Sequence, residues 1–204
     1  MMKILTIVGA RPQFIKAAVV SRELKDKFEE VVVHTGQHYD YNMSEIFFRE
    51  LDIPNPKYNL NISGGTHSQM TARMMVALEE VLIIENPDMV LLYGDTNSTL
   101  SGALVAAKLQ IPICHVESGN RLGSLYNPEE INRICTDHLS SLLLCCSESA
   151  IESLREEGFK DKIYLVGDPM YDAFLYYSNK INKSLYGKIN DIFGNEIIVP
   201  DKYY

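Results

Sequence analysis

Residues 3–12 read KILTIVGARP. The first six are a continuous apolar run of strand length, and glycine, alanine, arginine and proline follow at once. Proline is tolerated in the first turn of a helix, so this stretch predicts a buried strand, a sharp turn and then a helix. Residues 14–24 have the helical periodicity that such a unit requires. A strand that is apolar throughout is typical of a parallel sheet covered on both faces.

The strand–turn–helix unit recurs through residues 1–170. Predicted strands span residues 3–8, 30–34, 88–93, 111–116, 142–145 and 163–166. Predicted helices span residues 14–24, 42–51, 66–85, 98–109, 128–139 and 147–157. Strands that alternate with helices in this way predict an α/β fold, a Rossmann-like parallel sheet with helices on both faces.

The end of the chain departs from this rhythm. Residues 174–190 are aromatic, basic and rich in asparagine, which predicts a helix that leads into a linker, and residues 195–204 begin an apolar strand and stop. We therefore predict an N-terminal Rossmann-like domain at 1–173, a linker helix and linker at 174–195, and the truncated start of a second Rossmann-like domain at 196–204.

The composition limits the classes of protein and partner. Of 204 residues, 46% are hydrophobic and 23% are charged, which excludes a disordered chain. Nineteen Lys and Arg against 27 Asp and Glu give a net charge of −8, which argues against a nucleic-acid binder but not against a small phosphorylated ligand. We expect no leader peptide and no membrane span, because no apolar run approaches about 20 residues. The four cysteines lack metal spacing and predict buried free thiols in a reducing cytoplasm.

Ligands bind such sheets at the carboxyl ends of the strands. The turns at those ends span residues 9–11, 35–38, 94–96, 115–121 and 167–168. In the first turn, the start of the helix offers backbone N–H groups and a positive dipole end to an anion. Arg11 would add a planar pair of donors, and Lys16 lies about one turn further on, so a diphosphate fits there. The alternative is a tight turn in which Arg11 pairs with a nearby carboxylate.

Two carboxylates follow the ends of predicted strands. Asp95 stands at one tip, either as a ligand contact or as the cap of the next helix. Glu117 would lie near it if the strands are neighbours, and two close carboxylates raise one another's proton affinity, as a general acid or base requires. The alternative for Glu117 is an ion pair with Arg121 or Arg133.

A further acidic and basic set lies on one predicted helix. Glu129, Arg133 and Asp137 share one face of it, and the alternative to a site role is a surface ladder of ion pairs worth little. We expect His115 and His138 to be satisfied core or hinge histidines. No spacing of His, Cys, Asp and Glu indicates a metal site, and no Ser-His-Asp elbow is evident.

Six motifs occur in order along the chain. They are G-A-R-P-x-x-I-K at 9–16, T-G-Q-H at 35–38, G-D-T-x-S-T at 94–99, H-V-E-S-G at 115–119, N-P-E-E-I-N-R-x-x-T-D-H at 127–138 and V-G-D-P-M-Y-D-A at 166–173. Together they resemble the N-terminal half of the non-hydrolysing UDP-N-acetylglucosamine 2-epimerases, and the resemblance covers essentially the whole chain.

That resemblance implies the first domain of a two-domain, glycosyltransferase-B-like architecture, with the active site in the cleft between the domains. Such enzymes are typically homodimers in the cytoplasm. The implied reaction interconverts UDP-GlcNAc and UDP-ManNAc at C2 of the sugar, by elimination of UDP to a 2-acetamidoglucal and re-addition of UDP. The reaction needs neither a nicotinamide cofactor nor a metal. The expected partner is a UDP-N-acetylhexosamine substrate.

The resemblance also assigns roles to individual residues. The candidate acid/base carboxylates are Asp95, Glu117 and Glu129. The candidate cationic and substrate-positioning groups are Arg11, Lys16 and Arg133. Gln37 and His38 lie in a turn that some bacterial members associate with a second, regulatory UDP-GlcNAc.

Two departures from the family pattern shape the hypotheses. Residues 122–127 carry no charge where many members have arginines, and Asn120 stands where leucine is usual, so a related UDP-2-acetamido sugar is an alternative substrate. We also expect the family's C-terminal domain, with its catalytic-site histidine, to be missing, which predicts an inactive isolated chain with a surface prone to association. A non-catalytic UDP-sugar-binding or interaction remnant is a second hypothesis for the function. A sugar transferase is a third, and the motifs argue against it.

Overall fold

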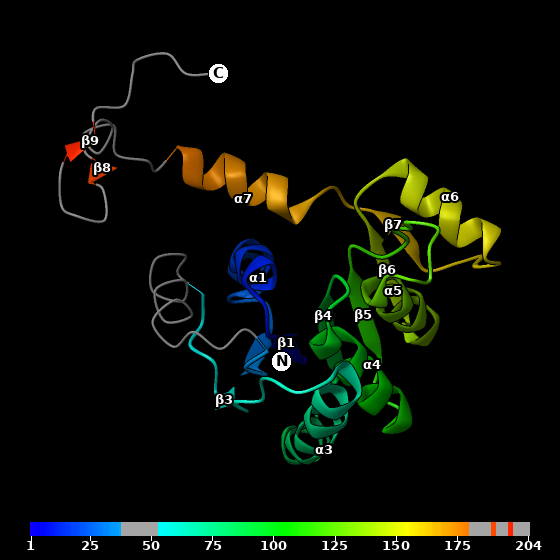
Figure 1. The fold of residues 1–204 in the computed structure, drawn as a ribbon, viewed down its shortest axis with the longest axis horizontal. Helices are drawn as coiled ribbons and strands as arrows, with labels where there is room; N and C mark the ends of the chain where they lie inside the picture. Colours follow the sequence, from blue (N-terminus) through cyan, green and yellow to red (C-terminus); the bar gives the residue numbers. More distant parts are fainter. Residues whose placement is uncertain (38–52, 180–188, 191–195, 198–204) are drawn as a thin grey trace.

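A seven-stranded parallel sheet forms the centre of the molecule (Figure 1). The computed structural model describes residues 1–37, 53–179, 189–190 and 196–197. The strands lie in the order β3-β2-β1-β4-β5-β6-β7, and each pair of neighbours runs parallel. The predicted Rossmann-like sheet is confirmed. Its strand order reverses between β1 and β4, which marks the carboxyl edge there as the ligand-binding edge of a doubly wound fold.

The six predicted strands are all present, with ends shifted by no more than two residues. The sheet consists of β1 (Lys3–Val8), β2 (Glu29–His34), β3 (Tyr58–Asn59), β4 (Met89–Tyr93), β5 (Ile113–Val116), β6 (Leu142–Cys145) and β7 (Ile163–Leu165). β3 lies in a predicted loop, because a strand of two residues carries no periodic pattern. A separate antiparallel pair is formed by β8 (Ile189–Asn190) and β9 (Glu196–Ile197).

The helices follow the predicted order. They are α1 (Arg11–Leu24), α3 (His67–Glu85), α4 (Asn97–Lys108), α5 (Pro128–Leu139), α6 (Glu148–Glu156) and α7 (Pro169–Ser178). The helix predicted at 42–51 lies outside the described residues. α7 starts at Pro169, earlier than the predicted start at 174, because Asp168 accepts a hydrogen bond from the Met170 N–H at 2.8 Å and proline suits the first turn.

Both faces of the sheet are buried because successive side chains of a strand enter different apolar clusters. In β1, Leu5 and Ile7 pack on one face with residues of α3 and α4. Ile4 and Val8 pack on the other face with Phe14 of α1. This two-sided burial is the physical reason for the uninterrupted apolar run of β1.

The last helix, α7, lies beside α1. The guanidinium carbon of Arg22 in α1 is 3.6 Å from the centroid of the Tyr176 ring, a cation–π contact between the two helices. Two aromatic side chains of α7 remain largely exposed, Tyr171 at 60% and Phe174 at 67%. Exposed aromatic surface of this kind favours association with another protein surface.

No helix among residues 1–37 and 53–179 is both long and apolar enough to cross a membrane. All four cysteines are free, as predicted; Cys114 and Cys145 are buried, whereas Cys135 and Cys146 are half-buried.

Candidate active site

Lys16 and Glu117 form an ion pair over the end of β4. Their side chains are only 11% and 17% exposed, although they come from α1 and from the turn after β5. The predicted alternative partners of Glu117, Arg121 and Arg133, are therefore wrong. Lys16 was expected to face a diphosphate, and the structure instead directs it at the candidate general base.

Gly94 makes this ion pair sterically feasible. A Cβ atom at position 94 would lie 3.1 Å from the Glu117 Oε2 atom and 3.7 Å from the Lys16 Nζ atom, and the backbone there has φ of +61°. A side chain at this position would push against the carboxylate and would also adopt a left-handed backbone. The strand-end glycine thus allows Lys16 and Glu117 to meet above the backbone of β4.

Glu117 itself has a left-handed backbone, with φ of +68°. This conformation is uncommon for a residue with a side chain and persists where the surrounding structure requires it. The ladder between β4 and β5 continues up to the preceding residue, because the Gly94 N–H donates to the Val116 carbonyl at 3.0 Å. The change of direction at Glu117 turns its carboxylate back toward Lys16 and Gly94.

The second candidate carboxylate, Asp95, is paired with Arg133 of α5. The same helix holds the backbone of Asp95, because the Asn132 Nδ2 atom donates to its carbonyl at 2.9 Å. Asp95 does not cap α4; Thr96 does, accepting from the Thr99 N–H at 3.3 Å. The capping alternative for Asp95 is therefore wrong, and its carboxylate stays 31% exposed at the edge of the sheet.

The two adjacent glutamates at the start of α5 have different environments. Glu129 is exposed, and it forms no ion pair within the part of the chain that the structure describes. Glu130 is buried, accepts hydrogen bonds from the Leu122 and Gly123 N–H groups at 2.8 and 2.9 Å, and pairs with Arg133 at 2.8 Å. Glu130 was not predicted as a site residue, yet it connects the backbone of Leu122 and Gly123 to Arg133, the arginine that is paired with Asp95.

The turn after β1 uses its backbone donors internally. Oε1 of buried Gln13 accepts from the Gly9 and Ala10 N–H groups at 2.8 and 3.0 Å. Its Nε2 atom donates to the Tyr93 carbonyl at 2.8 Å and to the Thr99 hydroxyl at 3.0 Å. The prediction that this helix start offers its N–H groups to an anion is therefore wrong for these two groups.

The remaining part of that prediction rests on Arg11, which is exposed at the start of α1. Pro12 has no N–H, and the Gln13 and Phe14 N–H groups donate to the Ala10 carbonyl. Gln13 occupies the third helical position, where glutamine commonly bonds back to the cap. That pattern was the available sequence signal for its role.

The turn after β2 is tied to the start of α4. The Gln37 Oε1 atom accepts from the Ser98 N–H at 3.1 Å and from the Ser98 hydroxyl at 2.8 Å. Gln37 is thus already engaged with the protein, while His38 lies outside the described residues. A ligand role for this turn stays a prediction.

His115 and Asp137 form a buried pair beneath the site. The His115 Nδ1 atom lies 2.6 Å from the Asp137 carboxylate, and its Nε2 atom lies 2.7 Å from the Gly94 carbonyl. The expectation of a satisfied core histidine is confirmed for His115, whereas His138 is half-exposed and lies 3.5 Å from Glu157. Because Asp137 is completely buried, the surface-ladder alternative for it is wrong.

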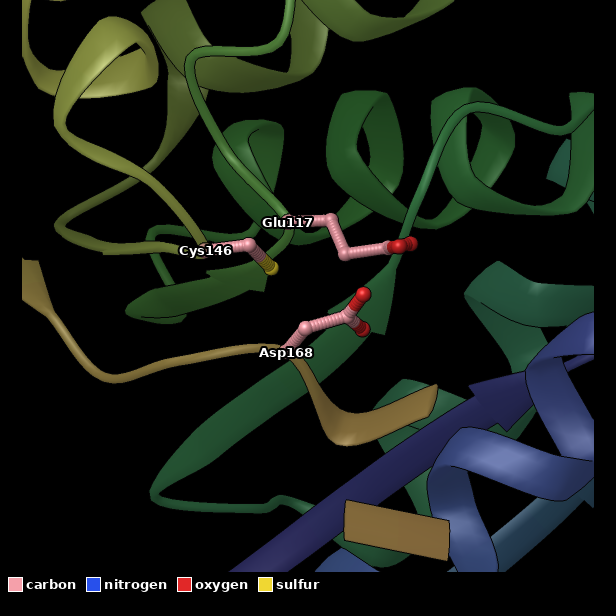
Figure 2. Close-up of side chains that lie close together, drawn as sticks. All are labelled: Glu117, Cys146 and Asp168. Carbon is pink, nitrogen blue, oxygen red and sulfur yellow. The ribbon is translucent and has the colours of Figure 1, made fainter. Parts of the chain in front are cut away.

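Two further groups, Cys146 and Asp168, lie near Glu117 at the ends of β5, β6 and β7. Figure 2 shows the side chains of Glu117, Cys146 and Asp168 converging, with one potential ligand atom from each within 4.8 Å of the others. Burial, together with the nearby carboxylates of Glu117 and Asp168, raises the pKa of the Cys146 thiol to about 12. A metal ion here would have to displace a thiol proton and compete with Lys16 for Glu117.

The edge of the sheet therefore carries two carboxylate–cation pairs, Glu117 with Lys16 and Asp95 with Arg133, on either side of the Gly94 turn. A carboxylate held by a single cation can accept a proton from carbon when the cation is drawn toward a negatively charged leaving group. The structure brings together four of the predicted site residues in this arrangement and leaves Glu129 and Arg11 exposed at its border.

Comparison with known proteins gives consistent matches. A family model described as UDP-N-acetylglucosamine 2-epimerase matches residues 22–199. A UDP-2,3-diacetamido-2,3-dideoxy-D-glucuronate 2-epimerase of Pseudomonas aeruginosa is 55% identical over 184 residues, 88% of this chain and 52% of the relative. A UDP-N-acetylglucosamine 2-epimerase of Methanocaldococcus jannaschii is 44% identical over 207 residues, 100% of this chain and 55% of the relative.

Solved structures agree with the sequence matches. The crystal structure of the Methanocaldococcus jannaschii UDP-GlcNAc 2-epimerase in complex with UDP-GlcNAc and UDP superposes with a TM-score of 0.86 and 46% identity, covering 90% of this chain and 52% of that one. The chain spans about half the length of the curated relatives it matches. That half is the first domain of their glycosyltransferase-B-like fold.

Proposed function

The chain belongs to the UDP-N-acetylglucosamine 2-epimerase family, and we propose that it carries the acid/base half of a nucleotide-sugar 2-epimerase site. The observation that carries the proposal is the ion pair of Glu117 with Lys16 beside that of Asp95 with Arg133. The proposed reaction interconverts UDP-GlcNAc and UDP-ManNAc. The chain's length relative to its relatives supports a requirement for a second domain.

The proposed chemistry begins with loss of UDP. A carboxylate takes the proton from C2 of the sugar as the bond between C1 and the diphosphate oxygen breaks, which yields a 2-acetamidoglucal and UDP. The reverse addition returns UDP to C1 while a protonated acid delivers a proton to the other face of C2. This sequence needs two proton-transfer groups on opposite faces and positive charge near the departing diphosphate.

We assign these roles by position. Glu117 and Asp95 are the proposed proton-transfer groups, and exposed Glu129 is the third candidate at the start of α5. Arg133 and Arg11 are the proposed diphosphate contacts, and Lys16 orients Glu117. The supporting feature is the low exposure of the Lys16–Glu117 pair, because a partly desolvated carboxylate interacts more strongly with charge than one in water.

A reconstitution assay tests the proposal. UDP-GlcNAc is incubated with the chain alone, with the chain co-expressed with or fused to the second domain of a full-length relative, and with the Glu117→Gln form of that pair. Proton NMR follows UDP-ManNAc. We expect turnover only from the combination that contains Glu117. Robust turnover by the chain alone would contradict the need for a second domain, and inactivity of every combination despite UDP-GlcNAc binding would favour the non-catalytic binding alternative.

A second candidate substrate has its own support. The Pseudomonas aeruginosa relative, at 55% identity, is named for a UDP-2,3-diacetamido-2,3-dideoxy-D-glucuronate. The uncharged stretch at residues 122–127 also departs from the pattern typical of the UDP-GlcNAc enzymes. Comparison of kcat/KM for the two UDP-sugars separates the candidates, and a higher value for the diacetamido sugar would replace UDP-GlcNAc as the proposed substrate.

The proposed setting is a homodimer in the cytoplasm, without a cofactor. Free thiols at all four cysteines support a reducing compartment. Sedimentation of the reconstituted two-domain protein tests the dimer. The proposed domain limits at 1–173, 174–195 and 196–204 are testable by limited proteolysis, which should cut first near the linker.

A further inference from the structure

The turn that carries Glu117 is held from below by one buried carboxylate of α5. Asp137 has no solvent exposure, and its oxygens lie 2.6 Å from His115 Nδ1, 2.8 Å from Arg121 Nη1 and 3.0 Å from the Gly119 backbone N. His115 precedes Glu117 by two residues, Gly119 follows it by two, and Arg121 follows it by four. Asp137 therefore contacts the turn on both sides of Glu117, the residue with the left-handed backbone.

Asp137 is held in its charged form by these contacts. Burial alone would raise the pKa of its carboxyl, but the hydrogen bonds from His115, Arg121 and the Gly119 N–H keep the pKa below its usual value. A charged acceptor with three donors fixes direction more strongly than a neutral one. The turn is thus anchored on a carboxylate that stays ionised at neutral pH.

The Asp137 carboxylate is also connected, through the imidazole of His115, to the turn that carries Asp95. The His115 Nε2 atom lies 2.7 Å from the carbonyl of Gly94, the residue before Asp95. The two ring nitrogens of His115 thus contact the Asp137 carboxylate on one side and the Gly94 carbonyl on the other. One chain of contacts therefore links Asp137 to the ends of both β4 and β5.

Backbone geometry shows why the turn needs this support. Glu117 and Gly119 both have positive φ, at +68° and +80°, within three residues. A Cβ atom at Gly119 would collide with the Ala150 carbonyl of α6, so the turn is pressed closely against that helix. A left-handed backbone at a residue with a side chain, as at Glu117, persists only where neighbouring groups over-determine it.

We propose that Asp137 is a positioning residue that sets the relative placement of Asp95 and Glu117, and so aims Glu117 at Lys16. α5 would then position both carboxylates, because Arg133 on the same helix is paired directly with Asp95. The catalytic consequence rests on the proposed function, whereas the structural consequence does not.

Amide hydrogen exchange on the Asp137→Asn chain tests the structural consequence. The Oδ1 atom of Asp137 bonds His115, and its Oδ2 atom accepts from Gly119 and Arg121. Asparagine keeps only one acceptor oxygen and no charge, so it cannot serve all these donors on both sides of Glu117. We expect the Gly119 N–H to exchange about tenfold faster or more. The Leu122 and Gly123 N–H groups, which donate to Glu130, should keep their protection.

Glu85→Gln is the matched control, because Glu85 is also a buried carboxylate with cationic partners but lies at the other end of the sheet. It should weaken the domain without selective loss of protection at Gly119. Unchanged exchange of Gly119 in Asp137→Asn, or equal acceleration at all amides, would overturn the proposal. If Asp137→Asn does not fold, the wild-type chain decides: a Gly119 N–H that exchanges as fast as exposed loop amides contradicts the proposal.

The catalytic consequence is read in the reconstituted enzyme. We expect Asp137→Asn to lower kcat about tenfold or more with little change in KM, because the proton-transfer groups rather than the binding contacts are displaced. Glu85→Gln should retain its kcat. A selective exchange effect with an inactive wild-type enzyme would support the positioning role and refute the proposed function, so the two failures are distinguishable.

Discussion

The two ends of the sheet both hold a partly or fully buried glutamate, and they hold it differently. At the amino end, Glu85 accepts from the Tyr58 hydroxyl and from Lys57 and Lys3, so three donors converge on one carboxylate. At the carboxyl end, Glu117 has a left-handed backbone, and Lys16 is its one cationic partner among the described residues. The carboxylate of Glu85, with three donors, is arranged to stabilise the fold. The carboxylate of Glu117, paired with Lys16, can still accept another partner during a reaction.

Backbone conformation separates the two ends in the same sense. Glu85 is the last residue of the regular helix α3, whereas Glu117 lies in a turn that glycines and a buried network support. Strain gathers at functional sites and is compensated by the surrounding structure. The comparison implies that changes at the carboxyl end should affect turnover more than stability, and changes at the amino end the reverse.

The largest expected effect comes from the cation of the singly held pair. Lys16→Met leaves Glu117 without its partner and should reduce turnover of the reconstituted enzyme about 10²- to 10⁴-fold. Lys57→Met is the matched control, because Tyr58 and Lys3 still hold Glu85, and it should change stability little and leave turnover unchanged. Equal turnover by the two variants would remove the contrast between the ends.

The next effect isolates the steric role of Gly94. Gly94→Ala should cost about 1–2 kcal/mol for its left-handed backbone and should also separate Glu117 from Lys16. Gly123→Ala is the matched control, because φ there is +72° but nothing lies within 4 Å of the added Cβ atom. Thermal unfolding and turnover are measured on both. Similar loss of activity in the two would show that backbone strain, rather than the close contact, is responsible.

The third effect belongs to the amino end and depends on pH. Hydrogen bonds from Lys57 and Tyr58 lower the pKa of Glu85 from 4.5 to about 2. A depressed folded-state pKa stabilises the protein above pH 4.5, and this contribution is lost as the pH falls through the folded value. Glu85→Gln should therefore lower the free energy of unfolding by about 1–3 kcal/mol at pH 7. Denaturant titrations should show the difference from wild type shrinking between pH 4.5 and pH 2; a constant difference would refute the pKa assignment.

The smallest effect concerns the cap of α7. Asp168→Ala removes the acceptor for the Met170 N–H and should cost about 1 kcal/mol, whereas Asp168→Asn should keep the cap nearly intact. Loss of the Asp168 charge in either variant should lower the pKa of the Cys146 thiol from about 12. Thiol alkylation against pH reads this shift. An unchanged alkylation profile would show that Asp168 does not act on the thiol.

The fold was largely predictable because the strands are buried on both faces and read as apolar runs. Strand ends shifted little, since glycine and proline mark the turns after β1 and β4. β3 could not be predicted, because two residues have no period. α7 was placed late, because the capping signal of Asp168 and Pro169 carries less weight than the aromatic stretch that follows it.

Four of the predicted site residues meet at the carboxyl edge of the sheet, but their pairings could not be predicted. Lys16 and Glu117 are separated by 101 positions, and their contact depends on Gly94 and on the left-handed turn, neither of which a pattern specifies. Burial of Asp137 was missed because helical spacing defines a shared face without showing what lies opposite it. Gln13 could have been found from its place at the third position of α1.

Exchange of the C2 proton tests the central claim, that Glu117 held by Lys16 transfers that proton. UDP-GlcNAc is incubated in D₂O with the two-domain reconstituted enzyme, and deuterium at C2 of the substrate and product is measured by NMR for wild type and Glu117→Gln. We expect deuterium at C2 with wild type and a rate lower by about 10²-fold or more with Glu117→Gln. Incorporation at the wild-type rate by Glu117→Gln would contradict it.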